Sequence, residues 1–162
     1  MFKVVDADPD DAGEVLTVQR AAYLSEAAIY QHFGLPPLTE TLAGIRAAIA
    51  ALTVLKAVAG TRIVGAVRGR VEGDTCYVGR LAVAPDLQGQ GIGTALLRAI
   101  EDRFPAVPRF ELFTGARSEA NLRLYRRLGY VDLEPRPGDH PDLSYLAKVH
   151  TGPRGPADHA AP

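Results

Sequence analysis

Residues 81–97 read LAVAPDLQGQGIGTALL, and this stretch decides how the chain folds. A short apolar run ends at Pro85, three glycines follow at alternate positions, and apolar residues then recur at helical spacing as far as Phe104. A strand that turns into a helix in this way presents unpaired N–H groups at the positive end of the helix dipole. Because glycine has no Cβ, the backbone can approach a ligand closely. The stretch therefore predicts a site for a phosphate-bearing ligand.

The rest of the chain supplies short strands and helices on both sides of this stretch. Val-rich runs separated by glycine-containing turns precede it and predict an antiparallel meander. After it, Ser118 is expected to cap a helix that Gly129 closes. The expected elements are strands at 2–5, 54–59, 62–71, 75–83, 109–114, 130–133 and 143–149, and helices at 11–30, from about 39, from the glycine-rich turn to 104, and at 118–128.

These elements follow one another in the order β-α-α-β-β-β-α-β-α-β-β. That order predicts an α/β (α+β) fold, in which a mixed, mostly antiparallel sheet of about seven strands is flanked by helices and gains a parallel crossover at the glycine-rich turn. We expect one domain over residues 1–150. Residues 151–162 are rich in Pro, Gly and Ala, which predicts a disordered tail.

The composition argues against several classes of function. The 162 residues carry a formal net charge of −1, from 18 basic and 19 acidic side chains, so the chain lacks the basic excess that tracks a nucleic acid. The one cysteine, Cys76, allows no intramolecular disulfide and no Cys-rich metal site, and its apolar neighbours predict a buried structural thiol. No secretion signal or membrane-length apolar run is visible, so we expect a cytoplasmic protein without a membrane partner.

Three kinds of glycine-rich loop compete to explain residues 88–93. A Walker A loop needs G-x-x-x-x-G-K-(S/T), and no lysine lies nearby. A dinucleotide fingerprint needs G-x-G-x-x-G, usually in the first βα unit, whereas these glycines run G-x-G-x-G in mid-chain. The stretch instead closely resembles the acetyl-CoA-binding segment of the GNAT acyltransferase superfamily, whose pattern (Q/R)-x-x-G-x-(G/A) is met by Gln88, Gly91 and Gly93 after a matching L-x-V-x-P.

A second stretch, NLRLYRRLGY at 121–130, also resembles a segment of that superfamily, so the resemblance spans roughly residues 52–133. It implies that acetyl-CoA is the co-substrate and that no metal is required. Amides of the glycine-rich loop would hold the CoA pyrophosphate, although a tight glycine turn can also serve packing alone. The implied cofactor-binding residues are Leu81, Ala82, Val83, Gln88, Gly89, Gln90, Gly91, Ile92, Gly93, Thr94, Asn121 and Tyr125.

The resemblance also implies roles in catalysis. Backbone groups at 81–83 would bind the pantetheine arm as an added strand, Asn121 would hydrogen-bond that arm, and Tyr125 would protonate the departing thiolate. A half-buried tyrosine whose hydroxyl merely finds a partner is the alternative for Tyr125. Many relatives carry a strand glutamate at places that correspond here to Tyr77 or Gly79, and neither is acidic.

The catalytic base therefore has several candidates. Glu26 shares a helix stripe with two tyrosines that would line the acceptor groove, Glu72 is the alternative carboxylate, and ordered water could also carry the proton away. Arg80 could orient an anionic group or simply lie at the sheet surface. The expected activity is direct transfer of an acyl group from CoA to a primary amine, which makes the chain an N-acetyltransferase of a small-molecule or peptide amine.

Two other functions fit the same cofactor site. One is an acyl-CoA-binding or regulatory module without catalysis, and the other is an acetyltransferase of protein N-termini or lysines. Exposed strand edges also allow a homodimer.

Overall fold

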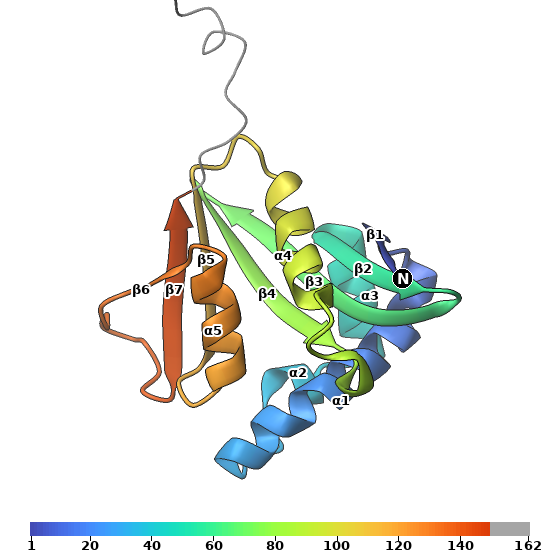
Figure 1. Cartoon of the computed structure of the whole chain (residues 1–162), viewed down its shortest axis with the longest axis horizontal. Helices are drawn as coiled ribbons and strands as arrows, with labels where there is room; N and C mark the ends of the chain where they lie inside the picture. The colour runs from blue at the N-terminus through green and yellow to red at the C-terminus, as the bar shows by residue number, and fades with distance from the viewer. Residues whose placement is uncertain (150–162) are drawn as a thin grey trace, which may run out of the picture.

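The computed structural model describes residues 1–149, so the tail expected at 151–162 lies outside the described residues. Within them the strands and helices follow the expected order (Figure 1). Their bounds are β1 Lys3–Asp6, α1 Ala12–Tyr30, α2 Pro36–Thr39, α3 Leu42–Ala51, β2 Thr53–Ala59, β3 Arg62–Glu72, β4 Thr75–Val83, α4 Ile92–Asp102, β5 Arg109–Gly115, α5 Glu119–Arg127, β6 Val131–Asp132 and β7 Leu143–Val149, with 3-10 turns at Pro9–Asp11 and Pro85–Leu87.

The seven strands form one mixed sheet in the order β1-β2-β3-β4-β5-β7-β6. Every neighbouring pair is antiparallel except β4 and β5, which run parallel because α4 forms a crossover between them. The predicted fold class, a mostly antiparallel mixed sheet flanked by helices, is confirmed.

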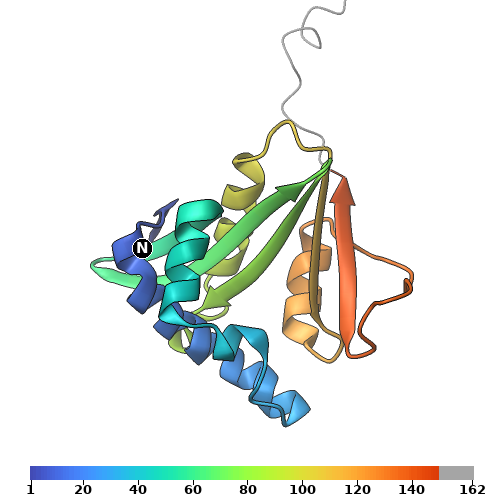
Figure 2. The same ribbon diagram turned by 180° about the vertical axis from the view of Figure 1, so that it is seen from behind.

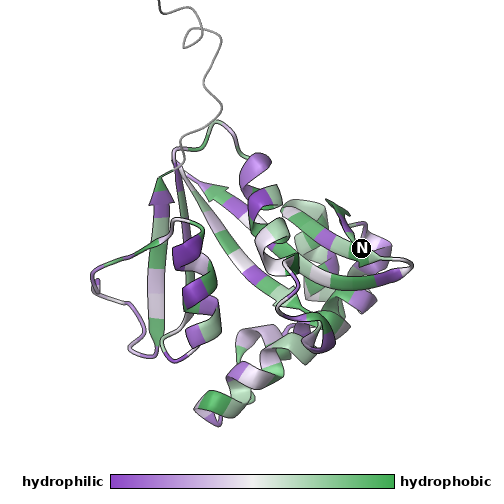
Figure 3. Ribbon diagram, in the orientation of Figure 1, coloured by the Kyte–Doolittle hydropathy of each residue, from purple (hydrophilic) through white to green (hydrophobic). Residues whose placement is uncertain are grey.

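Helices cover the two faces of the sheet unequally. α4 and α5 lie on one face, and α1 and α3 lie on the other over β2, β3 and β4. None of the helices within residues 1–149 covers β5 and β7 on that second face (Figures 1 and 2). The core is divided accordingly, with Leu96, Leu97 and Phe110 buried under α4 and α5, and Val15 and Ile45 buried under α1 and α3. Figure 3 shows hydrophilic residues on the outward side of α5.

The region before α3 differs from the sequence prediction. Instead of one helix starting near Thr39, the chain forms the short α2 and then α3, whose N-terminus is capped by the Thr41 hydroxyl accepting from Gly44 N at 3.0 Å. α2 starts at Pro36, three residues before the predicted start of a helix. Proline suits this place for two reasons. The N–H groups of a first helical turn have no helical acceptor, so a missing donor costs nothing, and the φ fixed by the proline ring is close to the helical value.

β4 and β5 are paired only near their first residues. Their ladder runs from Thr75–Arg109 to Tyr77–Glu111, and beyond it the two strands diverge into the V that is visible in Figure 1. The sheet is therefore split at its centre, and no strand among the described residues pairs with the β4 edge that faces the opening after Tyr77.

A β-bulge lies on β4 beside this split. Arg80 and Leu81 together oppose the single residue Val67 of β3, because the register shifts between the Ala66–Ala82 and Arg68–Gly79 pairs. The bulge reverses which face each side chain takes. Cys76 and Val78 pack under α4, whereas Ala82, four residues further, packs under α1 and α3.

Candidate active site

The glycine-rich loop delivers the start of α4 to the open end of the split. Gly89 and Gly91 have φ of +77° and +86°, a conformation that only glycine adopts readily. The first helical hydrogen bond runs from Ala95 N to Gly91 O at 3.0 Å, so the N–H groups of Ile92–Thr94 precede it and have no helical acceptor. These groups and the helix dipole together favour an anion at this place.

A second contact fixes the loop against the sheet. Arg62 on β3 donates two hydrogen bonds of 2.9 Å to the carboxylate of Asp86, in the turn just before the glycines. The bidentate geometry positions the loop without occupying its amides.

A cavity of about 600 Å³ opens between this loop, α5 and the second half of α1. The residues that line it are Ala22, Tyr23, Ser25, Glu26, Ile29, Leu81, Val83, Gln88, Gly89, Gly91, Ile92, Gly93, Thr94, Ser118, Glu119, Ala120, Asn121, Arg123, Leu124 and Arg127. Three residues of the predicted site do not line it, namely Ala82, Gln90 and Tyr125.

The divergent edge of β4 forms one wall. Leu81 and Val83 line the cavity, whereas Ala82 packs under α1, so only the backbone of Ala82 is available to a ligand here. Gly93 lies opposite, where a Cβ would come within 3.3 Å of Leu124 Cδ2 on α5. The absence of a side chain at Gly93 thus keeps α4 and α5 close together at the cavity.

Asn121 and Tyr125 lie one turn apart on α5. The Asn121 amide donates to Thr114 Oγ1 at 3.3 Å and borders the cavity. Tyr125 is only 6% exposed, and its ring packs edge-on against Tyr130 with centroids 6.2 Å apart. Its hydroxyl has no hydrogen-bond partner within residues 1–149. Burial raises the pKa of Tyr125 well above its usual value, and Tyr23 and Glu26 nearby raise it further, so the phenol is protonated at neutral pH.

Glu26 is held at the cavity by a contact that the sequence did not predict. Ser118 is the N-cap residue of α5, as predicted, but its buried hydroxyl donates to Glu26 Oε1 and makes no capping hydrogen bond to the helix. Gly115 permits this approach, because a Cβ there would lie 2.7 Å from Glu26 Oε2. One turn on, the Tyr30 hydroxyl accepts from Arg117 N at 2.9 Å and donates to Asp142 O at 3.2 Å. α1 therefore bridges the split between β4 and β5.

The structure separates the other candidate groups from the cavity. Glu72 lies at the β3–β4 turn, pairs with Arg70, and has a side chain that is 68% exposed. Cys76 is fully buried under α4, and this burial raises its pKa to about 11, which fits the predicted structural thiol. Of the two candidate carboxylates, only Glu26 borders the cavity.

Two cationic residues of the cavity were missed by the sequence analysis. Arg123 and Arg127 lie one turn apart on α5 and border the cavity beside the glycine-rich loop. Their i, i+4 spacing was visible in the sequence, but it did not show which face of α5 looks toward the loop. They place positive charge where the helix dipole of α4 already favours an anion.

Two negative findings apply to the described part of the chain. Residues 1–149 contain no group of three or more His, Cys, Asp or Glu side chains placed to hold a metal ion. No helix in the same range is long and apolar enough to cross a membrane.

Solved structures share this architecture. The PaiA N-acetyltransferase from Thermoplasma acidophilum, solved in complex with coenzyme A, matches with a TM-score of 0.81 and 13% identity over 93% of this chain and 99% of that one. The ribosomal-protein-S18-alanine N-acetyltransferase from Escherichia coli matches with a TM-score of 0.68 and 19% identity over 92% and 94%. At these identities the likeness shows the fold.

Sequence comparison identifies the family. The UPF0157 protein YqkA of Bacillus subtilis is 28% identical over 123 residues, which cover 76% of this chain but only 35% of the relative. The chain thus spans about a third of the length of this curated relative. A family model described as "Acetyltransferase (GNAT) family" matches residues 22–130, which contain the glycine-rich loop, the split and all of α5. Because this match covers more than half of the chain, the chain belongs to the GNAT family of acetyltransferases.

Proposed function

We propose that this chain is an acetyl-CoA-dependent N-acetyltransferase that moves the acetyl group directly from CoA to a primary amine. The observation that carries the proposal is the cavity between the free amides at the start of α4 and the unpaired edge of β4. A CoA molecule needs both features, since its pyrophosphate is anionic and its pantetheine arm carries amides that can pair with a strand edge.

The cofactor would lie along the cavity from the loop to the split. The N–H groups of Ile92–Thr94 would bind the pyrophosphate, and Arg123 and Arg127 would add positive charge at the same end. Backbone groups of Leu81–Val83 would pair with the pantetheine arm, and the Asn121 amide would hydrogen-bond it from α5. The thioester would then lie near Leu81, where α1, β4 and α5 meet.

The reaction needs one proton to move from the amine to the sulfur. The neutral amine attacks the thioester carbon, a C–N bond forms, and backbone N–H groups near Leu81 stabilise the oxyanion. As the C–S bond breaks, Tyr125 gives its proton to the thiolate, and the nitrogen loses a proton to Glu26. The raised pKa of Tyr125 keeps that proton on the phenol until the sulfur becomes negative. Exchange with water, which takes the proton from Glu26 and returns one to Tyr125, completes the balance.

Tyr77 and Gly79 stand where many relatives carry a strand glutamate. The lack of a carboxylate there favours one alternative function, an acyl-CoA-binding module without catalysis. Two measurements separate it from an enzyme. Calorimetry with acetyl-CoA tests the cofactor site, and release of free CoA thiol in the presence of a panel of amines and short peptides tests transfer. Binding with no thiol release for any acceptor would favour the module, and no heat for acetyl-CoA would refute both functions. Acetylation of peptides but not of small amines would identify a protein-modifying enzyme.

The roles assigned to side chains have their own test. Tyr125→Phe should lower kcat by about a hundredfold with little change in the CoA dissociation constant, the usual contribution of a general acid. Glu26→Gln should lower kcat similarly, again with little change in the CoA dissociation constant. Tyr130→Phe is the matched control, because its hydroxyl binds Glu101 in the core rather than the cavity. Full turnover in Tyr125→Phe would discard the acid role.

A further inference from the structure

Arg80 has an unusual backbone for a residue with a side chain. It lies in the β4 bulge with φ of +53°, a left-handed conformation that Cβ sterics disfavour. Only one other non-glycine residue within 1–149, Gln31 at the end of α1, has a positive φ. Strain of this kind persists where the surrounding structure imposes it, and it is concentrated at functional sites. Arg80 directly precedes Leu81, which lines the cofactor cavity.

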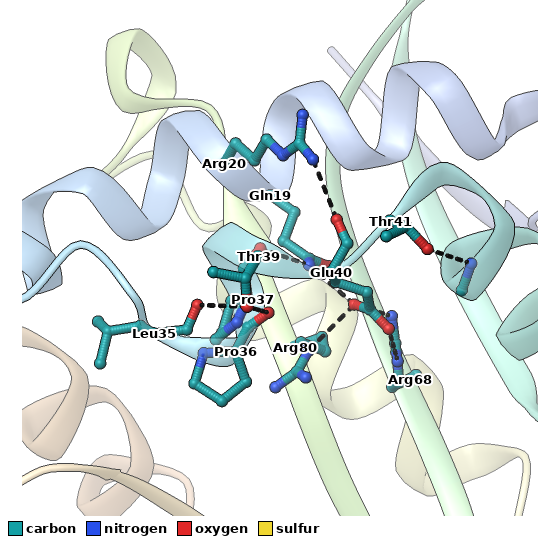
Figure 4. A network of polar contacts seen from close by, with 11 residues as sticks. Gln19, Arg20, Leu35, Pro36, Pro37, Thr39, Glu40, Thr41, Arg68 and Arg80 are labelled. Carbon is teal, nitrogen blue, oxygen red and sulfur yellow. Dashed lines mark hydrogen bonds and ion pairs between the residues drawn. The ribbon is translucent and has the colours of Figure 1, made fainter.

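The Arg80 side chain joins a half-buried charge cluster around Glu40 (Figure 4). Arg68 donates two hydrogen bonds of 3.0 Å to the two Glu40 oxygens, and Gln19 Nε2 donates to Oε1 at 3.0 Å. Arg80 Nε adds a further contact to the same Oε1 at 3.3 Å. The side chains of Glu40, Arg68 and Arg80 are 15%, 15% and 24% exposed.

This cluster has more positive charge than its carboxylate can balance. Glu40 already accepts from Arg68 and Gln19, so Arg80 is the third donor on one oxygen. Two guanidinium groups against one carboxylate leave a net charge of one positive unit in a place with little solvent. Such an excess is unfavourable unless an anion compensates it.

The outer end of Arg80 is free to bind that anion. Its Nη1 and Nη2 atoms have no hydrogen-bond partner in the described part of the chain, and Figure 4 shows them turned away from Glu40. The sheet surface next to them is open, because a Cβ at Gly79 would meet no atom within 4 Å. Two parallel N–H donors in this fork match the geometry of a carboxylate.

A negative group lies on the other side of the same opening. Gln19, which shares Glu40 Oε1 with Arg80, lies one turn before Tyr23 on α1, and Glu26 follows Tyr23 by three residues on the same helix. Tyr23 and Glu26 border the cofactor cavity. The opening thus offers a cation at one end and the proposed base at the other.

We propose that Arg80 Nη1 and Nη2 bind a carboxylate of the acceptor, which is therefore a small amino acid whose amine lies a few atoms from its acid group. The carboxylate neutralises the excess charge of the Glu40 cluster, the carbon chain lies over Gly79, and the amine reaches Glu26 and the thioester. This inference rests on the proposed function and assigns its substrate class.

The test compares amino acids with their own carboxamides as acceptors. The wild-type protein should use the acid with at least about tenfold higher kcat/KM than the amide, the size of a charge-assisted contact. The comparison is conservative, because an amino amide has the lower amine pKa and so offers more of the reactive neutral amine. In Arg80→Gln the acid-to-amide ratio should fall at least about tenfold below the wild-type ratio, mostly through KM. Arg20→Gln, which removes a contact to the Glu40 backbone instead, should keep the wild-type ratio.

Further readouts keep the inference separate from folding and from catalysis. Arg80→Lys preserves the charge without the two-pronged guanidinium and should lose most of the preference for the acid. This variant serves as the test if Arg80→Gln does not fold. Calorimetry of amino acids with the CoA-loaded protein measures the carboxylate contact without transfer, and Arg80→Gln should weaken that binding about tenfold. Equal use of acids and amides, no binding of any amino acid, or equal loss of both kinds of acceptor in Arg80→Gln would overturn the inference. Acetyl-CoA binding and transfer to amides would in that case still support the proposed function.

Discussion

Replacing Glu40 by glutamine should destabilise the protein at neutral pH by about 2–3 kcal/mol and make its stability less dependent on pH. Burial alone would raise the pKa of Glu40, but hydrogen bonds from Arg68 and Gln19 and the charges of Arg68 and Arg80 outweigh it and hold the pKa at about 2, against an ordinary 4.5. A depression of about 2.5 units corresponds to about 3 kcal/mol at 1.36 kcal/mol per unit, and partial exposure of Arg80 reduces this to about 2.

The sign of the pH effect follows from the direction of this shift. Because the folded-state pKa is lower than the unfolded one, the carboxylate contributes its full stabilisation above pH 4.5 and loses it as the pH falls toward 2. Glutamine does not titrate. The difference in unfolding free energy between the wild type and Glu40→Gln should therefore be largest near neutral pH and shrink below 4.5, while the other carboxyl groups affect both proteins alike.

Urea unfolding at several pH values between about 7 and 3 measures this difference from the midpoints and a shared m-value. Glu72→Gln is the control, because its carboxylate pairs with Arg70 at an exposed turn and should change stability by less than about 0.5 kcal/mol. A difference that stays constant across this pH range would refute the electrostatic account of the cluster. Equal stability of Glu40→Gln and wild type at neutral pH would refute it as well.

Three further predictions concern other parts of the structure. Gly91→Ala and Gly138→Ala both place a side chain at a φ near +90°, so each should lower the free energy of unfolding in urea by about 1–2 kcal/mol. Only Gly91→Ala should also weaken CoA binding in calorimetry. Equal CoA affinities of the two variants would contradict the assignment of the glycine-rich loop as the CoA site. Tyr130→Phe removes a 2.9 Å hydrogen bond to the buried Glu101 carboxylate and should cost about 1.5–3 kcal/mol in thermal unfolding, whereas a loss below about 0.5 would show that this bond adds nothing. Cys76, fully buried and with its pKa raised to about 11, should not react with a disulfide reagent near pH 8 until the protein is unfolded, so rapid labelling of the native protein would disprove its burial.

Local signals were enough to predict most of the fold from the sequence. Turn residues delimited the strands of the meander within a residue or two, and the glycine pattern at 88–93 located the start of α4. The element order then left few arrangements for the sheet, because a glycine-rich turn followed by a helix and a strand implies a parallel crossover. The family resemblance drew on the same two stretches, and it is confirmed by the family model.

The contacts that shape the site could not be predicted, because they join residues far apart in the sequence. Nothing near Ser118 indicates that its hydroxyl turns to Glu26 on α1, and a helix-start serine ordinarily caps its own helix. The ion pairs of Glu40 with Arg68 and Arg80 depend likewise on how the chain at α2 packs over the sheet. The bulge was missed as well, because Gly79 interrupts the β-prone pattern directly before it but a glycine in a strand does not by itself specify an extra residue.

The β4 bulge restricts how this strand can change length during evolution. Deleting Arg80 would leave Leu81 alone opposite Val67 and restore a regular alternation, in which Ala82 would still face α1 and Leu81 and Val83 would still face the cavity. Deleting Tyr77 instead would turn Cys76 out of the core under α4, because the residues before such a deletion exchange faces. Relatives with this layout should therefore tolerate a single-residue gap at Arg80 more readily than one between Thr75 and Gly79, and a gap at Arg80 in an alignment marks the loss of the bulge.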